Sequence, residues 1–358
     1  MRATQQLHDL GQSLWLDNIT RDLLNNGTLK KYIDELSVTG LTSNPTIFNH
    51  AIKNSDSYDE GISAGVKKGL AGEELFFDLA LEDLKTAADL FKMTHIRTAG
   101  VDGWVSLEVS PLLAYDTNTT VKVAKELHQQ AGRPNLFIKI PGTKEGLPAI
   151  EEAVFSGVPV NVTLLFSCEQ YLAAAEAYLR GVERRIAAGL NPNVHSVASL
   201  FLSRWDVAIA AKVPAELRNK LGLAIGNQAY KAYCELINSP RYLKALNAGA
   251  SVQRLLFAST GTKDPQAPDT LYITGLASPF TINTMPEPTL LAFADHGHAT
   301  ETISNCNSDC EKVLSAMEDA GINLTELAAT LQKEGAASFV TSWTELMDVI
   351  ASKSVILK

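Results

Sequence analysis

The most informative residue in this sequence is a lysine inside an apolar run. Among the lysines, Lys139 alone occupies the middle of a strongly apolar, strand-like segment, LFIKIP. Lysine is rarely buried without a partner, so the run raises the question of what the amine does there. A neutral amine attacks ketones and forms a Schiff base, and burial favours the neutral form. The sequence therefore indicates imine chemistry at Lys139, with a purely structural role as the alternative.

Such chemistry also needs groups that move protons, and two carboxylates stand in comparable positions. Asp17 ends the segment LWLD, and Glu108 lies in VSLEV. Asp17 alone could equally cap a helix that begins near Ile19. Other polar residues lie within or just after apolar runs, namely Asn44, Asn161, Thr163, Ser199 and Ser259. Taken singly, each is more typical of a core hydrogen bond, a turn or a cap, but together they suggest one site.

Eight short apolar runs that alternate with longer helical patterns are the predicted strands. They are Ser13–Asp17, Val38–Asn44, Gly103–Val109, Leu136–Ile140, Val158–Leu164, Val194–Leu200, Arg254–Ser259 and Leu271–Thr274. Alternation over a whole chain predicts a parallel sheet. The absence of a glycine-rich phosphate turn favours an α/β fold of the closed (β/α)8 TIM barrel type, with additional helices, over an open sheet. Polar residues near the strand ends would then meet at the rim where active sites of this fold form.

Two segments exceed a minimal barrel. Residues at about 45–100 and 300–358 carry helical patterns. The clearest of these patterns are Glu73–Met93, Asp309–Ala320 and Leu324–Glu334. Gly321 follows the second of them, as a helix C-terminus prefers. No linker rich in Pro, Gly or Ser separates these segments from the barrel, so we expect residues 1–358 to form a single domain.

Composition excludes several classes of function. The chain has 358 residues, of which 46% are hydrophobic, so it can bury a full core. Its net charge of −9 and the lack of a basic run argue against nucleic acid or an anionic membrane as partner. A polar N-terminus and the absence of a long apolar run predict neither signal peptide nor membrane span. Four scattered cysteines are typical of a reducing compartment, and we expect a cytoplasmic protein.

Six segments resemble the transaldolase family, specifically its longer bacterial branch. They are LWLDN, GLTSNPTIF, VSLEVSP, IKIPGTKEGLPAI, NVTLLFS and SLFLSRWD, and they occur in the family's order. The similarity covers about residues 10–300; IKIPGT and TSNPTIF are specific, whereas SLFLSR alone is weak. The resemblance implies a cofactor-free transferase of the pentose phosphate pathway, a monomer or homodimer. It would convert sedoheptulose 7-phosphate and glyceraldehyde 3-phosphate to erythrose 4-phosphate and fructose 6-phosphate.

The resemblance also implies the catalytic roles. Lys139 would form the Schiff base with the dihydroxyacetone unit. Asp17 would take the proton of the substrate's C4 hydroxyl during cleavage and return it during condensation. Glu108, together with a water held by Thr163, would move protons while the imine forms and breaks down.

Substrate contacts follow from the same resemblance. Asn44 and Asn161 would hold hydroxyls of the dihydroxyacetone unit. Ser199 and Arg204 would position the substrate and bind its phosphate, which a guanidinium fork suits well.

The sequence departs from the family after the seventh strand. Many transaldolases have a serine there, followed two residues later by a phosphate-binding arginine. This chain reads Ser259-Thr-Gly-Thr-Lys263, so the arginine is missing. We expect Ser259 to belong to the site and Lys263 to supply the charge as a more flexible point cation.

Three alternatives stay open at this point. A Schiff-base aldolase would release free dihydroxyacetone, as the small fructose-6-phosphate aldolases do; these are shorter and usually carry Gln where this chain has Glu108. A metal-dependent aldolase would need a third ligand beside His296 and His298, and Cys306 with Cys310 gives only half a metal site, so we expect no metal. A non-enzymatic relative would have lost the site residues, which are all present.

Overall fold

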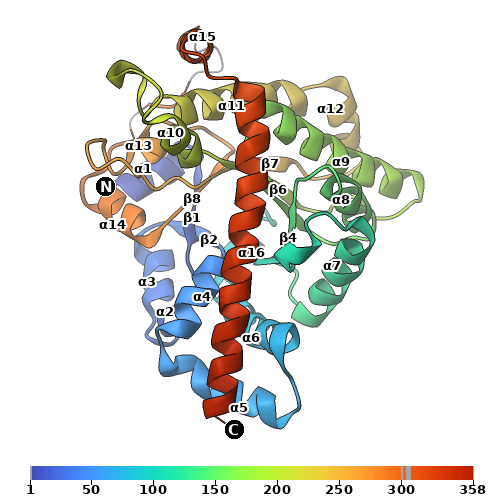
Figure 1. The fold of residues 1–358 in the computed structure, drawn as a ribbon. Coiled ribbons are helices and arrows are strands. Elements are labelled where there is room, and N and C mark those ends of the chain that lie inside the picture. Colours follow the sequence, from blue (N-terminus) through green and yellow to red (C-terminus); the bar gives the residue numbers. More distant parts are fainter. Residues whose placement is uncertain (1, 300, 304–307, 358) are drawn as a thin grey trace.

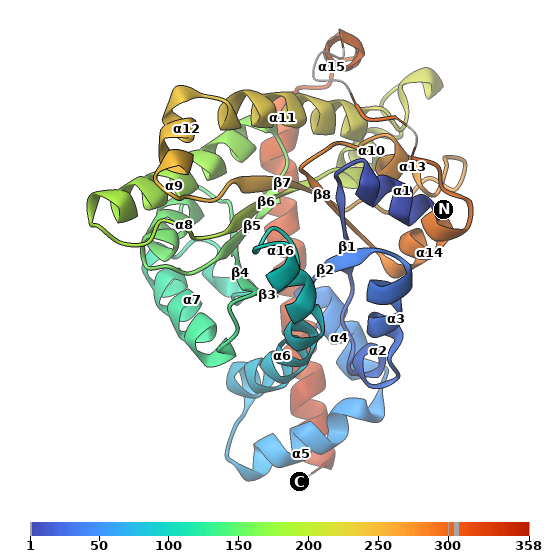
Figure 2. The ribbon, with the colours of Figure 1, turned by 180° about the vertical axis from the view of Figure 1, so that it is seen from behind.

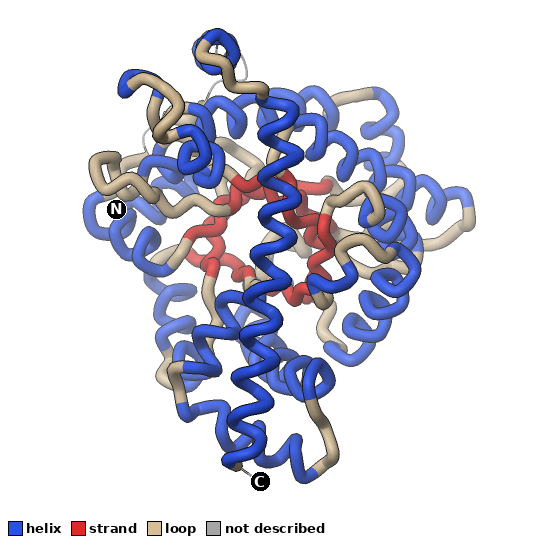
Figure 3. The backbone as a smooth tube through the Cα atoms, in the orientation of Figure 1, coloured by secondary structure: helices blue, strands red, loops and turns tan. Residues whose placement is uncertain are grey.

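The computed structural model describes residues 2–299, 301–303 and 308–357, and its centre is a ring of eight parallel strands (Figures 1 and 3). The strands are β1 Ser13–Asp17, β2 Val38–Thr42, β3 Val105–Glu108, β4 Leu136–Pro141, β5 Val160–Leu165, β6 Ser196–Phe201, β7 Gln253–Ala258 and β8 Ile282–Met285. They pair in the order β2-β1-β8-β7-β6-β5-β4-β3. A parallel bridge between Gly40 and Trp104 links the two ends of this order. The predicted (β/α)8 TIM barrel is therefore confirmed.

Helices surround the ring on its outer side (Figure 2). They are α1 Ala3–Asp9, α2 Arg21–Asn25, α3 Thr28–Glu35, α7 Thr117–Ala131, α8 Gly146–Phe155, α9 Cys168–Ala187, α10 Ser203–Ile209, α11 Leu221–Ile237, α12 Pro240–Asn247, α13 Leu271–Thr274 and α14 Glu287–His296. Short polar side chains begin several of them. Ser167 forms a capping box with Gln170 at α9, which satisfies amides that the first turn leaves open.

Additional helices occupy the two segments outside the minimal barrel. They are α4 Pro45–Lys53, α5 Asp59–Lys67, α6 Gly72–Arg97, α15 Ser308–Asp319 and α16 Leu324–Ile356. The last helix, predicted only as far as Glu334, is a single helix of 33 residues. It runs across one end of the barrel, in front of the strands in Figure 1 and behind them in Figure 2. Within the described residues, no helix combines the length and the apolarity that spanning a membrane requires.

The predicted eighth strand is wrong. Leu271–Thr274 forms the short helix α13, and the eighth strand is Ile282–Met285. An apolar run of four residues cannot be assigned by periodicity alone, and here the preceding turn starts a helix through the bond from the Ile273 amide to the Thr270 carbonyl. The true strand was missed because half of its residues, Asn283 and Thr284, are polar although buried.

The N-terminal end of the barrel is closed by a buried polar cluster and aromatic rings. Arg254 lies 3.3 Å from Asp102 and donates to Ser13 Oγ over 2.6 Å. Beside them Trp104 stacks on Phe137, with ring centroids 4.0 Å apart. The open space of the barrel therefore lies at its other end, where the strands finish.

Candidate active site

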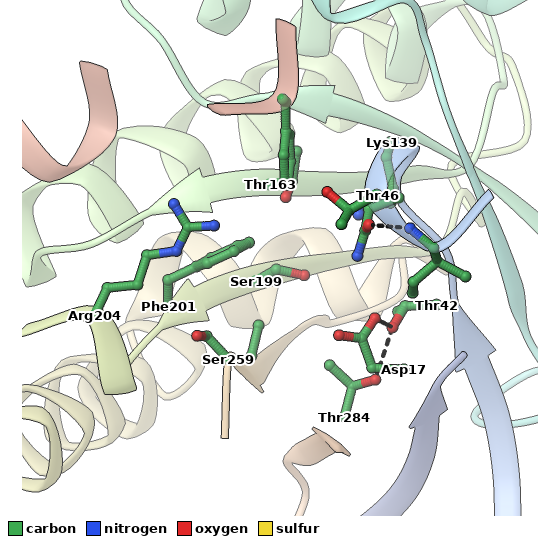
Figure 4. Close-up of a pocket in the computed structure, with 14 residues that line it drawn as sticks. Asp17, Thr42, Thr46, Lys139, Thr163, Ser199, Phe201, Arg204, Ser259 and Thr284 are labelled. Carbon is green, nitrogen blue, oxygen red and sulfur yellow. Dashed lines mark hydrogen bonds between the residues drawn. The ribbon is translucent and has the colours of Figure 1, made fainter. Parts of the chain in front are cut away.

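A cavity of about 230 Å³ opens at the C-terminal ends of the strands. Most of the predicted site residues line it: Asp17, Asn44, Lys139, Thr163, Ser199, Arg204 and Ser259. They come from six strands or the segments that directly follow them. Figure 4 shows Arg204 on one side of the cavity and Asp17 on the other. Residues separated by more than 200 positions in the sequence thus share one small space, as this fold allows.

Lys139 is held by two oxygen atoms at the base of the cavity. Its Nζ lies 3.0 Å from Glu108 Oε2 and donates to the carbonyl oxygen of Ser43 over 2.9 Å. Glu108 and Lys139 are direct register partners on β3 and β4, so both side chains leave the sheet on the same face. Lys139 is 5% exposed and Glu108 4% exposed. The amine is therefore fixed in place, with one edge open to the cavity.

Glu108 retains acceptor capacity beyond this ion pair. Neither of its carboxylate oxygens accepts a hydrogen bond of standard geometry from another described residue, although Oε2 is in short contact with Lys139. Burial raises the pKa of the Glu108 carboxyl, and the positive charge of Lys139 opposes this effect only in part. The hydroxyl of Thr163 on β5 is also fully buried and forms no hydrogen bond with the part of the chain that the structure describes. A proton acceptor and a hydroxyl thus remain available near the amine.

Asp17 faces the cavity from the end of β1. Its Oδ1 accepts a hydrogen bond of 2.8 Å from Thr42 Oγ1, which also contacts Thr284 Oγ1 at 2.8 Å. Burial raises the pKa of the Asp17 carboxyl, while the charges of Lys139 and Lys263 lower it by smaller amounts. A carboxylate that is poorly solvated and oriented by one hydroxyl is well suited to accept a proton from a substrate.

The two asparagines have different surroundings. Asn161 is buried beside Lys139, donates to Ser106 Oγ over 3.1 Å and accepts from Ser199 Oγ over 2.7 Å. It lies behind the cavity wall, whereas Ser199 lines the cavity. Asn44 lines the cavity and caps α4 through a bond from the Ile47 amide to its Oδ1. Its amide nitrogen remains available to a ligand.

Arg204 is a cation whose donors are not used by the described part of the chain. Among the described residues it has no hydrogen bond or ion pair, and its guanidinium carbon lies 5.6 Å from the centre of the Phe201 ring. Burial lowers the pKa of Arg204, and the carboxylate of Glu334 raises it by less. Its unoccupied donors therefore face the cavity at the side away from Asp17 (Figure 4).

Lys263 does not line this cavity. It lies in a neighbouring depression of about 370 Å³, together with Arg218, Asn219 and Tyr272. The two spaces share a wall in which Ser203 Oγ and Ser259 Oγ are 2.8 Å apart. Ser259 itself has a φ of 54°, so its side chain is set by an uncommon left-handed backbone.

Several residues that line the cavity were not predicted from the sequence. They are Thr42, Thr46, Ile47, Phe201, Ala258, Thr284 and Phe339. Thr42 and Thr46 stand within the segment that contains Asn44, so their proximity could have been inferred. Thr284 belongs to the strand that was misassigned. Phe339 comes from α16, and its sequence position gives no signal that it reaches the barrel.

Of the residues considered for a metal site, His296, His298 and Cys310 do not line this cavity. His296 is exposed on α14 and its Nε2 lies 3.0 Å from Asp269 Oδ1. Within the described ranges, no three His, Cys, Asp or Glu side chains are grouped so as to hold a metal ion. Cys306 lies outside the described residues, and Cys310 is buried in α15.

The chain is similar to known proteins over most of its length. The family model described as transaldolase/fructose-6-phosphate aldolase matches residues 14–350. A protein named transaldolase from Thermobifida fusca (strain YX) is 45% identical, covering 98% of this chain and 97% of the relative. One from Renibacterium salmoninarum is 44% identical, covering 96% and 95%. A protein named transaldolase 2 from Nostoc sp. (strain PCC 7120) is 37% identical, covering 98% and 97%. The chain belongs to the transaldolase/fructose-6-phosphate aldolase family.

Proposed function

We propose that this protein is a transaldolase of the pentose phosphate pathway. It transfers a dihydroxyacetone unit from sedoheptulose 7-phosphate to glyceraldehyde 3-phosphate, which gives erythrose 4-phosphate and fructose 6-phosphate. The observation that carries the proposal is the buried lysine, 3.0 Å from a buried carboxylate at the C-terminal end of the barrel. The names of the relatives support the same reaction.

The first step is formation of the imine at Lys139. The Nζ atom attacks the C2 carbonyl of the ketose, and the resulting carbinolamine loses water when its hydroxyl is protonated. Glu108 delivers and removes protons here, since it is 3.0 Å from Nζ and its raised pKa lets it alternate between the protonated and ionised forms. The buried hydroxyl of Thr163 orients the water that carries these protons.

The second step is cleavage of the bond between C3 and C4. Asp17 accepts the proton of the C4 hydroxyl, the C3–C4 electron pair moves toward the protonated imine, and the aldehyde leaves. What remains on Lys139 is an enamine, which is nucleophilic at C3. An acceptor aldehyde then binds, C3 attacks its carbonyl carbon, and Asp17 returns the proton to the new hydroxyl. Hydrolysis of the imine releases the product ketose and restores the amine.

Substrate binding uses the polar residues that surround Lys139 and Asp17 in the cavity. Asn44 and Ser199 contact hydroxyls of the dihydroxyacetone unit, and Asn161 supports Ser199 through their 2.7 Å hydrogen bond. Arg204 binds the phosphate, because its guanidinium lines the cavity and its donors form no hydrogen bond with the described residues. Ser259 lines the cavity next to Arg204, and Lys263 contributes charge from the adjoining depression.

An aldolase that releases free dihydroxyacetone uses the same lysine. Glu108 favours transfer, because its ionised form accepts hydrogen bonds but cannot protonate the enamine. The deciding experiment supplies fructose 6-phosphate with and without erythrose 4-phosphate. Formation of sedoheptulose 7-phosphate with little free dihydroxyacetone supports the transaldolase. If free dihydroxyacetone is released as fast as it is transferred, the protein is an aldolase and the transaldolase proposal is wrong.

The remaining properties follow from the proposed pathway. We propose that the protein acts in the cytoplasm, where sugar phosphates are metabolised and where buried reduced thiols such as Cys168 persist. It acts as a monomer or homodimer on sugar phosphates, and its chemistry needs neither cofactor nor metal.

A further inference from the structure

The long C-terminal helix comes close to the ends of the strands at a glycine, Gly335. α16 packs on β5, and a Cβ atom at Gly335 would lie 3.1 Å from Leu164 Cδ2 and 3.4 Å from Arg204 Nη1. A side chain at this position would therefore be in tight contact with both of these side chains. Figure 3 shows the helix crossing the end of the strand ring. This close approach brings side chains on the inner side of α16 within reach of the backbone around the cavity.

The strand beneath that contact contains an irregularity next to Thr163. The pairing of β5 with β6 shifts between Val162 and Leu165, so β5 has one extra residue there. Leu164 has a φ of 59°, a left-handed conformation that is uncommon for residues other than glycine. Such bulges change the direction of neighbouring side chains, and here the neighbour is the buried, unpartnered hydroxyl of Thr163.

Gln332 of α16 holds this irregularity from outside the barrel. Its Nε2 donates to the carbonyl oxygens of Leu164, over 2.9 Å, and of Gly142, over 3.1 Å. A side-chain amide has two N–H donors, so one group serves both carbonyls. The Gly142 amide in turn donates to the carbonyl of Thr163 over 2.7 Å. Gln332 thus links the segment that follows Lys139 to the bulge that follows Thr163.

We infer that Gln332 is a positioning residue for the reaction. It holds the left-handed bulge at Leu164, and the bulge directs the Thr163 hydroxyl to the space beside Lys139 and Glu108. The inference rests on the proposed role of Thr163 in orienting water. It gives α16 a part in proton transfer, although the helix follows the last strand and contributes no group that reacts.

The helix is attached independently of Gln332. Thr46 Oγ1 contacts Ser342 Oγ at 2.8 Å, Trp343 Nε1 donates to Glu73 over 3.0 Å, and Lys353 Nζ lies 2.6 Å from Asp59. Substitution of Gln332 should therefore leave α16 docked and the barrel folded. This separation makes the inference testable by kinetics.

The first test compares Gln332→Met, which has a similar shape but no donors, with Lys333→Met on the exposed side of the same helix turn. Displacement of a proton-transfer group by a fraction of an ångström should lower kcat by about 10- to 100-fold. KM for fructose 6-phosphate should change little, because no contact with the substrate is lost, and Lys333→Met should match the wild type. Wild-type kcat in a folded Gln332→Met enzyme would overturn the inference.

The second test asks whether Gln332 acts through Thr163, by a double-mutant cycle. Thr163→Ala combined with Gln332→Met should be no slower than Thr163→Ala alone, because the hydroxyl to be positioned is already gone. If the double variant instead loses kcat by the product of the two single losses, Gln332 acts independently of Thr163, and the inference is overturned. If Thr163→Ala is itself as fast as the wild type, the proposed role of Thr163 fails instead. Thermal unfolding of each variant shows whether the measured enzyme is folded.

Discussion

Lys139 Nζ lies 3.0 Å from Glu108 Oε2, and both side chains are almost fully buried on adjacent strands. A buried ion pair is costly to desolvate and is weak evidence for stability alone. Here the carboxylate oxygens accept no hydrogen bond of standard geometry from the described residues, whereas a purely structural ion pair would use this acceptor capacity. These unused acceptors support the proposal that the pair transfers protons in an imine mechanism.

Glu108→Gln should change the fate of the enamine. The ionised carboxylate only accepts hydrogen bonds from the bound water, whereas the amide of glutamine can also donate to the water oxygen and turn a water hydrogen toward the enamine. The amide does not titrate, so imine formation should slow, and the reoriented water should protonate the enamine at C3 more often, after which the imine is hydrolysed. We expect slower transfer to erythrose 4-phosphate and a larger share of free dihydroxyacetone, measured by quantifying both products. If the Glu108→Gln variant gives the same ratio of transfer product to free dihydroxyacetone as the wild type, Glu108 does not control the fate of the enamine.

Arg204→Ala should weaken binding of the phosphate. Loss of one charge-assisted hydrogen bond costs about 1.5–3 kcal/mol, so we expect KM for fructose 6-phosphate to rise about 10- to 150-fold. Lys263→Ala should raise KM by less, because Lys263 lies in the adjoining depression. Lys144→Ala, at an exposed loop lysine, is the control. An unchanged KM in Lys263→Ala would show that this lysine does not replace the missing arginine.

Asp17→Asn should abolish cleavage yet stabilise the fold near neutral pH. The pKa of Asp17 is raised, so the folded protein binds this proton more tightly than the unfolded chain does. Above the pKa that Asp17 has in the folded protein, its ionised carboxylate therefore lowers the free energy of unfolding. This loss of stability disappears as the pH falls through that pKa toward the pKa that Asp17 has in the unfolded chain. We expect a higher Tm for Asp17→Asn at about pH 7 and a smaller gain at about pH 4.5.

The matched control is Asp319→Asn, at an exposed position at the end of α15. It should leave Tm unchanged at both pH values. A lower Tm for Asp17→Asn at neutral pH would contradict the view that the partly buried charge of Asp17 is destabilising.

The chain should unfold as one unit. α16 contacts α4, α5, α6 and β5, so the additional helices and the barrel share one core. Trp343 reports on α16, while Trp15 and Trp104 report on the barrel. We expect far-ultraviolet circular dichroism and tryptophan fluorescence to give coincident transitions in denaturant. Two separated unfolding transitions would instead show that the chain contains more than one independently folding domain.

The sequence was sufficient to predict the barrel and the presence of Lys139 and Glu108 together near the strand ends, for a physical reason. Lys139 and Glu108 are charged residues inside apolar strands, and such a pattern has few structural explanations. Thr284 could not be found in the same way, because a short strand with two polar residues looks like a turn. Phe339 and Gln332 reach the site only through the packing of a distant helix, which local patterns do not encode. The position of Lys263 beside the cavity likewise depends on a loop conformation.

The central claim is that Lys139 forms a Schiff base with the dihydroxyacetone unit, and trapping that adduct tests it most directly. The protein is incubated with fructose 6-phosphate and EDTA, reduced with borohydride, digested and mapped by mass spectrometry, with Lys139→Ala in parallel. We predict that the substrate-derived adduct is found on the peptide that contains Lys139, and that the folded Lys139→Ala protein is neither labelled nor active. Equal labelling of an exposed lysine such as Lys144, or an active Lys139→Ala enzyme, would contradict the account.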